Sequence, residues 1–399
     1  MRFKTYTSDW TKYRCSDFLK AYSTNSLSWD KLSYEDSEGV LNLHYGLIHN
    51  GAPTLIDTSS YNLPLIIEDM PKSYELCKNG DVIFADASED TNDICKPVEI
   101  YETSGKSIIS GLHTIHTRDY KDLTCVGFKG YLFSSKSFHK QVFRLTQGTK
   151  IFSINFSNFR EMSVSIPQKE EQRKIVGFLS KIDERISTQS KIIDKLKSQM
   201  NCIIDNIIDY SAPQVQFKDL YTNAGEGGTP STSNNLYYEN GSIPFIKIED
   251  LSNKYLNENK DFITEQGLKN SSAWIIPANS IIYSNGATIG RISINTYPVC
   301  TKQGILGIIP SRIVLTEYLY YFLRSIYFRK QVHRITVKGT MDCAYLKDLN
   351  FIKCYIPALE RQEKIIKSLR CLDEKILLEE TILNKLKEQK KFLLSNMFI

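Results

Sequence analysis

Apolar residues recur along two long stretches of the chain at alternating steps of four and three positions. The first series consists of Ile175, Leu179, Ile182, Ile186, Gln189, Ile193, Leu196, Met200, Ile203 and Ile207. The second series consists of Ile365, Leu369, Leu372, Ile376, Glu379, Leu383, Leu386, Lys390, Leu393 and Met397. A heptad pattern of this length predicts two long helices that pair in a coiled coil. The alternative is two amphipathic helices that each lie on a separate globular core.

The two stretches are copies of one another. Pro167-Gln-Lys-Glu-Glu-Gln172-Arg-Lys-Ile175 corresponds to Pro357-Ala-Leu-Glu-Arg-Gln362-Glu-Lys-Ile365, and a shift of 190 positions keeps this register without a gap to Gln199 and Gln389. Proline suits the first turn of a helix, and the glutamates that follow it favour a helix N-terminus. The repeat therefore predicts two copies of one plan, each a globular segment followed by a long helix.

The order of the segments predicts how the helices pair. The second globular segment begins where the first helix ends and leads into the second helix, and the termini of a domain usually lie close together. We therefore expect the helices to run antiparallel, each about 60 Å long at roughly 1.5 Å per residue. The predicted architecture is an α+β protein with a pseudo-twofold internal repeat. It has globular domains at 1–166 and 211–356 and long helices at 167–210 and 357–399.

Composition and motif content weigh against an enzyme. The 399 residues suffice for two cores, and the net charge of +5 is mild. Nine cysteines without a Cys-x-x-Cys pair indicate reduced thiols. The absence of a signal peptide or an 18-residue apolar span indicates a cytoplasmic protein without membrane contact. P-loop, His-Glu-x-x-His and amino-methyltransferase Asn/Asp-Pro-Pro-Tyr/Phe sequences are absent, so we expect no catalytic or metal-binding residues.

Basic residues gather in one stretch of each globular segment. No acidic residue lies between Asp122 and Glu161, and none lies in 324–338. Both stretches include predicted helices, 135–145 in the first half and 317–332 in the second. Such local positive charge suits contact with phosphate groups. The alternative is a pair of lysine-rich helix faces that only contact water.

Loops between short β-type runs form a second group of candidates. They are 227–231, 284–291 and 301–304 in the second half, and 44–46, 85–88 and 110–113 in the first. Arg and Lys side chains read guanine, and Asn and Gln read adenine, although any one of these residues could instead serve the turn itself. The candidate DNA-binding residues are Tyr45, Ser88, Lys106, His113, Lys136, Lys140, Arg144, Lys150, Thr229, Ser231, Asn285, Thr288, Arg291, Lys302, Gln303, Arg329, Lys330, Arg334 and Lys338.

These motifs together resemble the specificity subunit of type I restriction–modification systems. The resemblance is carried by the paired Pro-x-x-Glu-x-Gln-x-Lys-Ile helices, by Gly227-Gly-Thr-Pro-Ser231 and by Asn285-Gly-Ala-Thr-Ile-Gly290. Gly80–Ser88 and Ser110–Ile115 are similar to the same family, so the resemblance covers nearly the whole chain. The first half departs from the pattern because it has no Gly-Gly-Thr-Pro opening, which makes its base-reading loops harder to place.

The resemblance implies two target-recognition domains, each reading one half of a bipartite, asymmetric site in double-stranded DNA. The helices would set the spacer and dock two methyltransferase (modification) subunits and, through them, restriction/translocase subunits. The helix residues expected to serve this role are Gln172, Ile175, Leu179, Ile186, Leu196, Gln362, Ile365, Leu369, Ile376 and Leu386. S-adenosylmethionine, ATP and Mg²⁺ are expected in the partner subunits and not in this chain. The alternatives are an unrecognised DNA-acting enzyme and a coiled-coil assembly scaffold without a DNA role.

Overall fold

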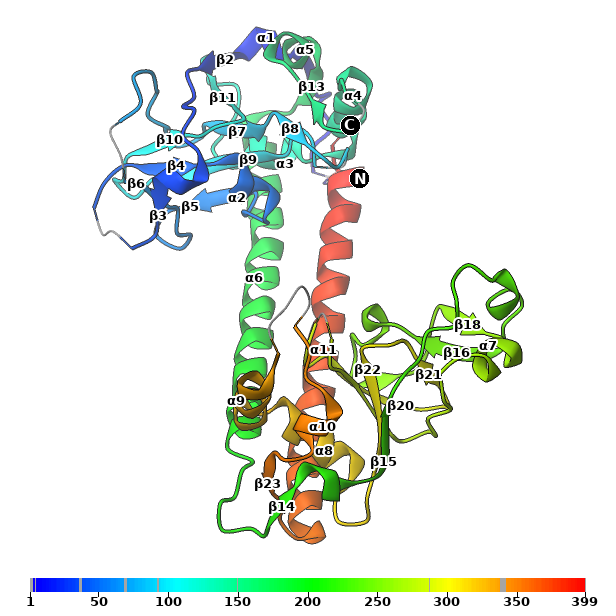
Figure 1. The fold of residues 1–399 in the computed structure, drawn as a ribbon. Helices are drawn as coiled ribbons and strands as arrows, with labels where there is room; N and C mark the ends of the chain where they lie inside the picture. Colours follow the sequence, from blue (N-terminus) through cyan, green and yellow to red (C-terminus); the bar gives the residue numbers. More distant parts are fainter. Residues whose placement is uncertain are drawn as a thin grey trace. The chain divides into compact units, whose positions relative to one another are not determined.

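The computed structural model describes residues 3, 5–35, 38–67, 70–91, 93–148, 150–286, 288–337 and 342–398. The chain divides into two compact units. Unit 1 comprises Met1–Ser190 and Thr381–Ile399, and unit 2 comprises Lys191–Glu380. Each unit contains sheets, short helices and one part of each long helix (Figure 1), which confirms the predicted α+β class.

A five-stranded sheet lies at the centre of unit 1 (Figure 1). Its strands in spatial order are β2 (Leu19–Tyr22), β11 (Thr114–Asp119), β7 (Val82–Ala85), β9 (Pro97–Glu102) and β5 (Leu55–Asp57). A four-stranded sheet contains β10 (Ile108–Ser110), β4 (Leu41–Leu43), β6 (Leu65–Ile66) and β3 (Leu32–Ser33). Two further pairs are β1 (Thr11–Arg14) with β13 (Ser163–Ile166), and β8 (Ala87–Ser88) with β12 (Phe152–Ser153).

The central strand of this sheet is buried on both faces, which explains its uninterrupted apolar sequence. Successive side chains of a strand point to opposite faces. Val82 and Phe84 accordingly join a core with helical residues, whereas Ile83 and Ala85 join a core with the four-stranded sheet. The helices of unit 1 are α1 (Cys15–Phe18), η1 (Trp29–Lys31), α2 (Tyr45–His49), α3 (Phe128–Phe133), α4 (Lys136–Leu145) and α5 (Phe156–Glu161).

Unit 2 repeats the five-stranded sheet with the same kind of strand order. Its strands are β15 (Tyr221–Glu226), β22 (Ile305–Pro310), β19 (Ile281–Ser284), β20 (Ile292–Asn295) and β17 (Tyr255–Leu256). A three-stranded sheet contains β18 (Asp261–Ile263), β16 (Ile243–Ile246) and β21 (Cys300–Thr301), and β14 (Gln214–Gln216) pairs with β23 (Lys353–Tyr355). The helices are η2 (Phe217–Leu220), η3 (Asn235–Tyr237), η4 (Ile248–Asp250), α7 (Glu265–Lys269), α8 (Thr316–Arg324), α9 (Ile326–Ile335) and α10 (Leu346–Leu349).

The two long helices are α6 (Lys169–Asp205) and α11 (Leu359–Asn396). Within unit 1, Asp183 of α6 pairs with Lys390 of α11 at 2.5 Å. Within unit 2, Lys197 pairs with Glu380 at 2.7 Å. Because the partner number falls as the α6 number rises, the helices run antiparallel (Figure 1), as predicted. The four-part domain division remains a prediction.

The predicted apolar series is wrong in detail near its end. Ile203 is 39% exposed, whereas its neighbour Ile204 is buried. The buried position therefore moves by one residue at this place only, because the last member of the series, Ile207, is buried as predicted. In α11, Ile366 is likewise buried and Ile365 only half-buried.

The predicted helical run 317–332 is also wrong, because it is two helices. Ser325 lies between α8 and α9, and its hydroxyl accepts a hydrogen bond from the backbone N–H of Phe328. Ser135 caps α4 in the same way through Phe138, so the predicted helix 135–145 begins one residue later. Serine at this position satisfies a backbone donor that the first helical turn leaves free.

Candidate nucleic-acid interface

The candidate loops of unit 1 meet at one end of the five-stranded sheet, where β7 ends and β11 begins. We call this end the loop edge of unit 1. Asp86 follows β7 and His113 precedes β11, and the backbone N–H of Asp86 donates to the carbonyl of His113 at 3.1 Å. The side chains also meet, with Nδ1 of His113 3.4 Å from Oδ1 of Asp86. The structure thus brings two of the predicted loops together through a specific pair of residues.

Aromatic and imidazole rings adjoin this pair. The ring of Tyr45 lies 5.3 Å from that of His113 and 4.5 Å from that of His44, and His44 in turn contacts the half-exposed Trp29 at 5.3 Å. His44 caps α2, because its Nδ1 accepts from the N–H of Gly46. Burial lowers the pKa of His44, and His113 lowers it further. The third predicted loop, 44–46, therefore also lies at the loop edge.

A short hairpin connects the loop edge to the basic helix α4. Gln147 and Ser153 exchange two backbone hydrogen bonds, and the N–H of Ile154 donates to the carbonyl of Asp86 at 2.9 Å. Strand β12 of this hairpin pairs with β8, so Ser88 lies opposite Phe152. Lys150 lies within the hairpin and is exposed.

The outer face of α4 is basic. Phe138 and Val142 are buried in the core, whereas the three cations at four-residue spacing are exposed: Lys136, Lys140 and Arg144. The predicted basic stripe is therefore present and faces solvent. Lys106 does not join it. It precedes β10, away from the loop edge, and its ammonium group donates to the carbonyl of Thr58 at 3.0 Å.

Unit 2 has the equivalent loop edge, where β19 ends and β22 begins. The N–H of Asn285 donates to the carbonyl of Gly304 at 3.0 Å, and the N–H of Gly304 donates to Glu226 at 2.7 Å. The N–H of Gln303 donates to the hydroxyl of Thr229 at 3.3 Å. Gly227 is required here, because a Cβ on it would lie 2.0 Å from the carbonyl oxygen of Thr301. The three predicted loops of this half therefore also meet.

The remaining candidates of these loops are mostly exposed. Thr288, Arg291, Lys302, Gln303 and Ser231 have exposed side chains, and Thr229 is half-buried. Asn285 differs, since it is fully buried and its Nδ2 donates to the carbonyl of Ala344 at 3.3 Å. Its side chain holds the loop from inside the protein, so this geometry leaves it no path to a base edge.

The connection from the loop edge to α9 repeats that of unit 1. Val337 and Cys343 exchange two backbone hydrogen bonds, and the N–H of Ala344 donates to the carbonyl of Asn285 at 2.9 Å. Arg329, Lys330 and Arg334 are exposed on α9. Lys338 lies outside the described residues. These two bridges were not predicted, although the 190-residue shift relates 147, 153 and 154 to 337, 343 and 344.

Gln172 and Gln362, which occupy equivalent places in the repeated Pro-x-x-Glu-x-Gln-x-Lys-Ile motif, form equivalent sets of hydrogen bonds inside the protein. We call these two sets the glutamine clamps. Oε1 of Gln172 accepts from the N–H of Cys125 at 2.8 Å, and its Nε2 donates to the carbonyls of Leu123 and Pro167 at 2.9 and 2.8 Å. Gln362 makes the same three bonds with Leu315, Ile313 and Pro357, all at 2.8 Å. Both glutamines are fully buried. Their contacts therefore join each long helix to the segment before α3 or α8, and neither side chain is accessible to a partner.

Most of the other helix candidates are also internal. Ile175, Leu179, Leu196, Leu369, Ile376 and Leu386 are buried, and Ile186 and Ile365 are partly buried. Their side chains therefore hold the helices to each other and to the cores. Two aspartates that hold the long helices to the globular segments were not among the predicted residues. Tyr131 donates to Asp183 at 2.9 Å, and Tyr321 donates to Asp373. The 190-residue shift relates both pairs and would have indicated them.

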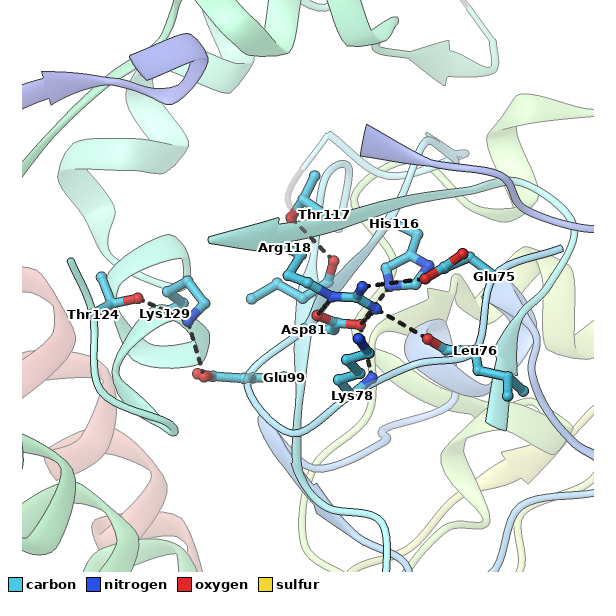
Figure 2. Close-up of polar contacts among 11 residues, drawn as sticks. Glu75, Leu76, Lys78, Asp81, Glu99, His116, Thr117, Arg118, Thr124 and Lys129 are labelled. Atoms are coloured by element: carbon cyan, nitrogen blue, oxygen red, sulfur yellow. Dashed lines mark hydrogen bonds and ion pairs between the residues drawn. The ribbon is translucent and has the colours of Figure 1, made fainter. Parts of the chain in front are cut away.

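A buried ionic network crosses the sheet of unit 1 (Figure 2). Asp81 accepts hydrogen bonds from Nε and Nη2 of Arg118 at 2.7 and 2.8 Å, from the N–H of Lys78 at 2.8 Å, and lies 2.8 Å from Nε2 of His116. Burial opposes ionisation of Asp81, but these bonds to Arg118 and His116 hold its pKa below the ordinary value. The network therefore stabilises a charged carboxylate inside the protein.

This network includes a possible set of metal ligands, because Cys77, Asp81 and His116 offer atoms within 4.8 Å of one another. The residues present fit an ion pair better than a metal site. A cation bound to Asp81 would lie beside the guanidinium group of Arg118, which already occupies both carboxylate oxygens. Burial also raises the pKa of the Cys77 thiol well above its ordinary value, which disfavours the thiolate that binds metals.

No helix within the described residues is long and apolar enough to span a membrane. The nine cysteines, all within those residues, are free thiols.

Comparison with known proteins gives a consistent result. The model of the family "Type I restriction modification DNA specificity domain" matches residues 110–198 and 214–388. The EcoR124I/EcoR124II specificity subunit of Escherichia coli is 27% identical over 236 residues, which are 54% of this chain and 57% of that protein. The MjaIX specificity subunit of Methanocaldococcus jannaschii is 33% identical over 164 residues, 40% of this chain and 38% of its own length. The matches thus span little more than half, or less, of these relatives.

Two solved structures share the fold. A chain from a structure of the type I R-M system superimposes with a TM-score of 0.61 at 15% identity, covering 97% of both chains. The S subunit of the type I system of M. genitalium gives a TM-score of 0.53 at 17% identity, covering 100% of this chain and 99% of its own. Since the family model matches more than half of the sequence, this chain belongs to the family of type I restriction-modification DNA specificity domains.

Proposed function

We propose that this chain is the DNA-recognition subunit of a type I restriction–modification complex. Unit 1 reads one half of a bipartite, asymmetric site in double-stranded DNA, and unit 2 reads the other. The chain carries out no chemistry itself and acts in the cytoplasm, where it directs two methyltransferase subunits and, through them, restriction/translocase subunits.

One observation carries this proposal: both units present the same group of elements at their loop edges. In each unit, loops from the strand ends are hydrogen-bonded to a bridged segment that follows a helix whose exposed face is basic. Exposed cations supply the phosphate contacts that position a protein on DNA, and loop side chains supply the base contacts that specify sequence. Two such surfaces with different side chains suit a site with two different halves.

The long helices are the proposed spacer and docking elements for the methyltransferase subunits. Most apolar side chains of these helices are buried inside the protein, so docking would involve the outer faces of α6 and α11. Leu378 of α11 is 59% exposed, and docking on these faces would cover it. We assign S-adenosylmethionine, ATP and Mg²⁺ to the partner subunits, as the resemblance to the family implies.

An exchange of one unit tests the proposal. Residues 1–166 are replaced by the matching segment of a family member with a different target, and the chain is produced with its methyltransferase partner. Mapping of methylated adenines across the host genome is expected to show a change in one half of the motif only. A change in both halves, or in neither, would contradict the assignment of one half-site to each unit.

Two rivals are tested with purified protein. An unrecognised enzyme would cleave or methylate DNA when the chain alone is incubated with Mg²⁺ and S-adenosylmethionine, and we expect neither product. A scaffold without a DNA role would give a complex whose DNA binding is undetectable or independent of salt. We expect the affinity of the assembled complex to fall steeply as the salt concentration rises.

A further inference from the structure

The loop edge of unit 1 contains an acidic residue where a DNA-contacting surface would ordinarily avoid one. Asp86 lies between the basic hairpin and the ring cluster, and its side chain is 31% exposed. A carboxylate close to phosphate groups is repelled unless it accepts a hydrogen bond from the nucleic acid. In the major groove, such donors are the amino groups at N4 of cytosine and N6 of adenine.

The position of Asp86 is fixed on three sides. Its N–H donates to the carbonyl of His113, its carbonyl accepts from the N–H of Ile154, and its Oδ1 lies 3.4 Å from Nδ1 of His113. Oδ1 itself is buried. Because the side chain is 31% exposed while Oδ1 is buried, Oδ2 is the carboxylate oxygen that can accept a hydrogen bond from outside.

His113 is held in a conformation that serves this contact. Its φ of 52° lies in the left-handed region, where His, Asn and Asp are the non-glycine residues found most often. The ring of Tyr45, 5.3 Å away at 83°, packs edge-on against the imidazole. The backbone hydrogen bond to Asp86 and the ring packing together keep the imidazole beside the carboxylate, so His113 acts as a positioning residue.

Within its described residues, unit 2 has no such pair of a carboxylate and an imidazole at the equivalent place. Asn285, which likewise follows the central strand, is buried and bonded to Ala344, and Gly304 stands where His113 stands in unit 1. The loop edge of unit 2 also has an exposed carboxylate, Glu226, but it accepts from the backbone N–H of Gly304 and not from an imidazole. A carboxylate held beside a histidine after the central strand is thus a difference between the two units, and the half-site of unit 2 serves as an internal control.

We propose that Asp86, positioned by His113, determines specificity in the half-site read by unit 1, by accepting a hydrogen bond from the amino group of a cytosine or adenine. This inference rests on the proposed function. It goes further in naming the residue and the chemical group that it reads.

The test uses the full chain with its methyltransferase partner and three variants. Asp86→Asn keeps the size of the side chain but removes its charge and replaces one of its two acceptor oxygens by an amide donor. His113→Asn removes the imidazole with a residue that tolerates positive φ. Glu89→Gln removes an exposed carboxylate three residues away and is the matched control. The readouts are the methylated motif in the host genome and competition binding to duplexes randomised in each half-site.

Asp86→Asn is expected to alter the preferred base at one position of the unit 1 half-site and to weaken binding of the original site roughly 10-fold. His113→Asn should relax the same position to a smaller extent, and Glu89→Gln should match the wild type. In all three, the half-site of unit 2 stays unchanged.

Unchanged base preference in Asp86→Asn would overturn the inference, and so would a change at the unit 2 half-site. If a variant complex binds DNA but does not methylate it, its base preference is measured by competition binding to the randomised duplexes and judged in the same way. A wild-type complex that neither binds nor methylates a bipartite site would instead refute the proposed function, so the two failures are distinguishable.

Discussion

The two units build the same strand order around different interiors. In unit 1, Val82 of the central strand stands opposite Glu99, which is fully buried. In unit 2, Ile281 stands at the equivalent place opposite Ile294. Glu99 accepts hydrogen bonds from the N–H groups of Gly127 and Gly130 at 2.8 and 2.7 Å and lies 3.5 Å from Lys129 (Figure 2), whereas the isoleucine only packs.

The same contrast recurs along the neighbouring strand. His116 pairs with Ile83 in unit 1, and Gly307 pairs with Ile282 in unit 2. The buried residue before the central strand is Asp81 in one unit and Ser280 in the other. The sheet of unit 1 therefore contains buried ion pairs, whereas the sheet of unit 2 has apolar residues and neutral polar residues such as Ser280 and Asn295 at its centre. Since a buried charge is costly once its partner is lost, the two units should respond differently to the same kind of change.

The largest effect is expected from Arg118→Ala. This change leaves Asp81 buried without its guanidinium partner and should reduce the stability of unit 1 by about 3 kcal/mol. Hydrogen exchange of amides in β7 and β19 would report each unit separately, and only β7 should lose protection strongly. Arg144→Ala removes an exposed cation of the same unit and should change stability by less than about 0.5 kcal/mol. Equal loss of protection in β7 and β19 would contradict the contrast between the interiors.

A smaller effect, equal in both units, is expected from the glutamine clamps. Gln172→Ala and Gln362→Ala each leave buried backbone groups without partners, which should cost about 2 kcal/mol. Chemical denaturation of the two variants measures this cost, and the exposed pair Gln199→Ala and Gln389→Ala provides controls at another repeated position. Strongly unequal effects of the two clamp variants would show that the repeat is not energetically symmetric.

The smallest expected effect is the change in the stability contributed by Asp81 as the pH is lowered. The folded-state pKa of Asp81 is lowered, so its contribution to stability is present above the ordinary value of 3.8 and is lost as the pH falls through the folded value. The stability difference between wild type and Asp81→Asn, about 1 kcal/mol near neutral pH, should therefore shrink below pH 3.8. Urea denaturation across pH measures it.

Glu99 acts in the opposite sense and in a different pH window. Burial raises its pKa above 4.5, although Lys129 opposes the shift. Its stabilising contribution is therefore present below pH 4.5 and is lost as the pH rises through the folded value. A difference between wild type and Asp81→Asn that grows on acidification would contradict the assignment of the low-pH dependence to Asp81.

The sequence predicted best those features that repeat at a constant spacing. Periodicity and the two copies of the Pro-x-x-Glu-x-Gln-x-Lys-Ile motif predicted the long helices and their antiparallel pairing. They also predicted the central strands and the basic helices α4 and α9. A closer use of the 190-residue shift would also have revealed the clamp partners, since it relates Leu123 to Ile313 and Cys125 to Leu315.

The features that could not be predicted depend on contacts across the sheet. Asp81 and Arg118 are 37 residues apart and meet only because β7 and β11 are neighbours. Likewise, nothing in the sequence indicates that Asn285 is buried while Asp86 is partly exposed, because both follow an apolar strand. The candidate loops were located correctly, but the orientation of each side chain depends on the three-dimensional packing around it.

The glutamine clamps have a consequence for how such a protein can change over evolution. Each glutamine forms its hydrogen bonds to the segment before α3 or α8 with main-chain atoms. This contact therefore depends on one N–H and one carbonyl of the globular segment and not on the identity of its side chains. Genetic recombination could exchange one globular segment for another and leave the junction with the long helix intact.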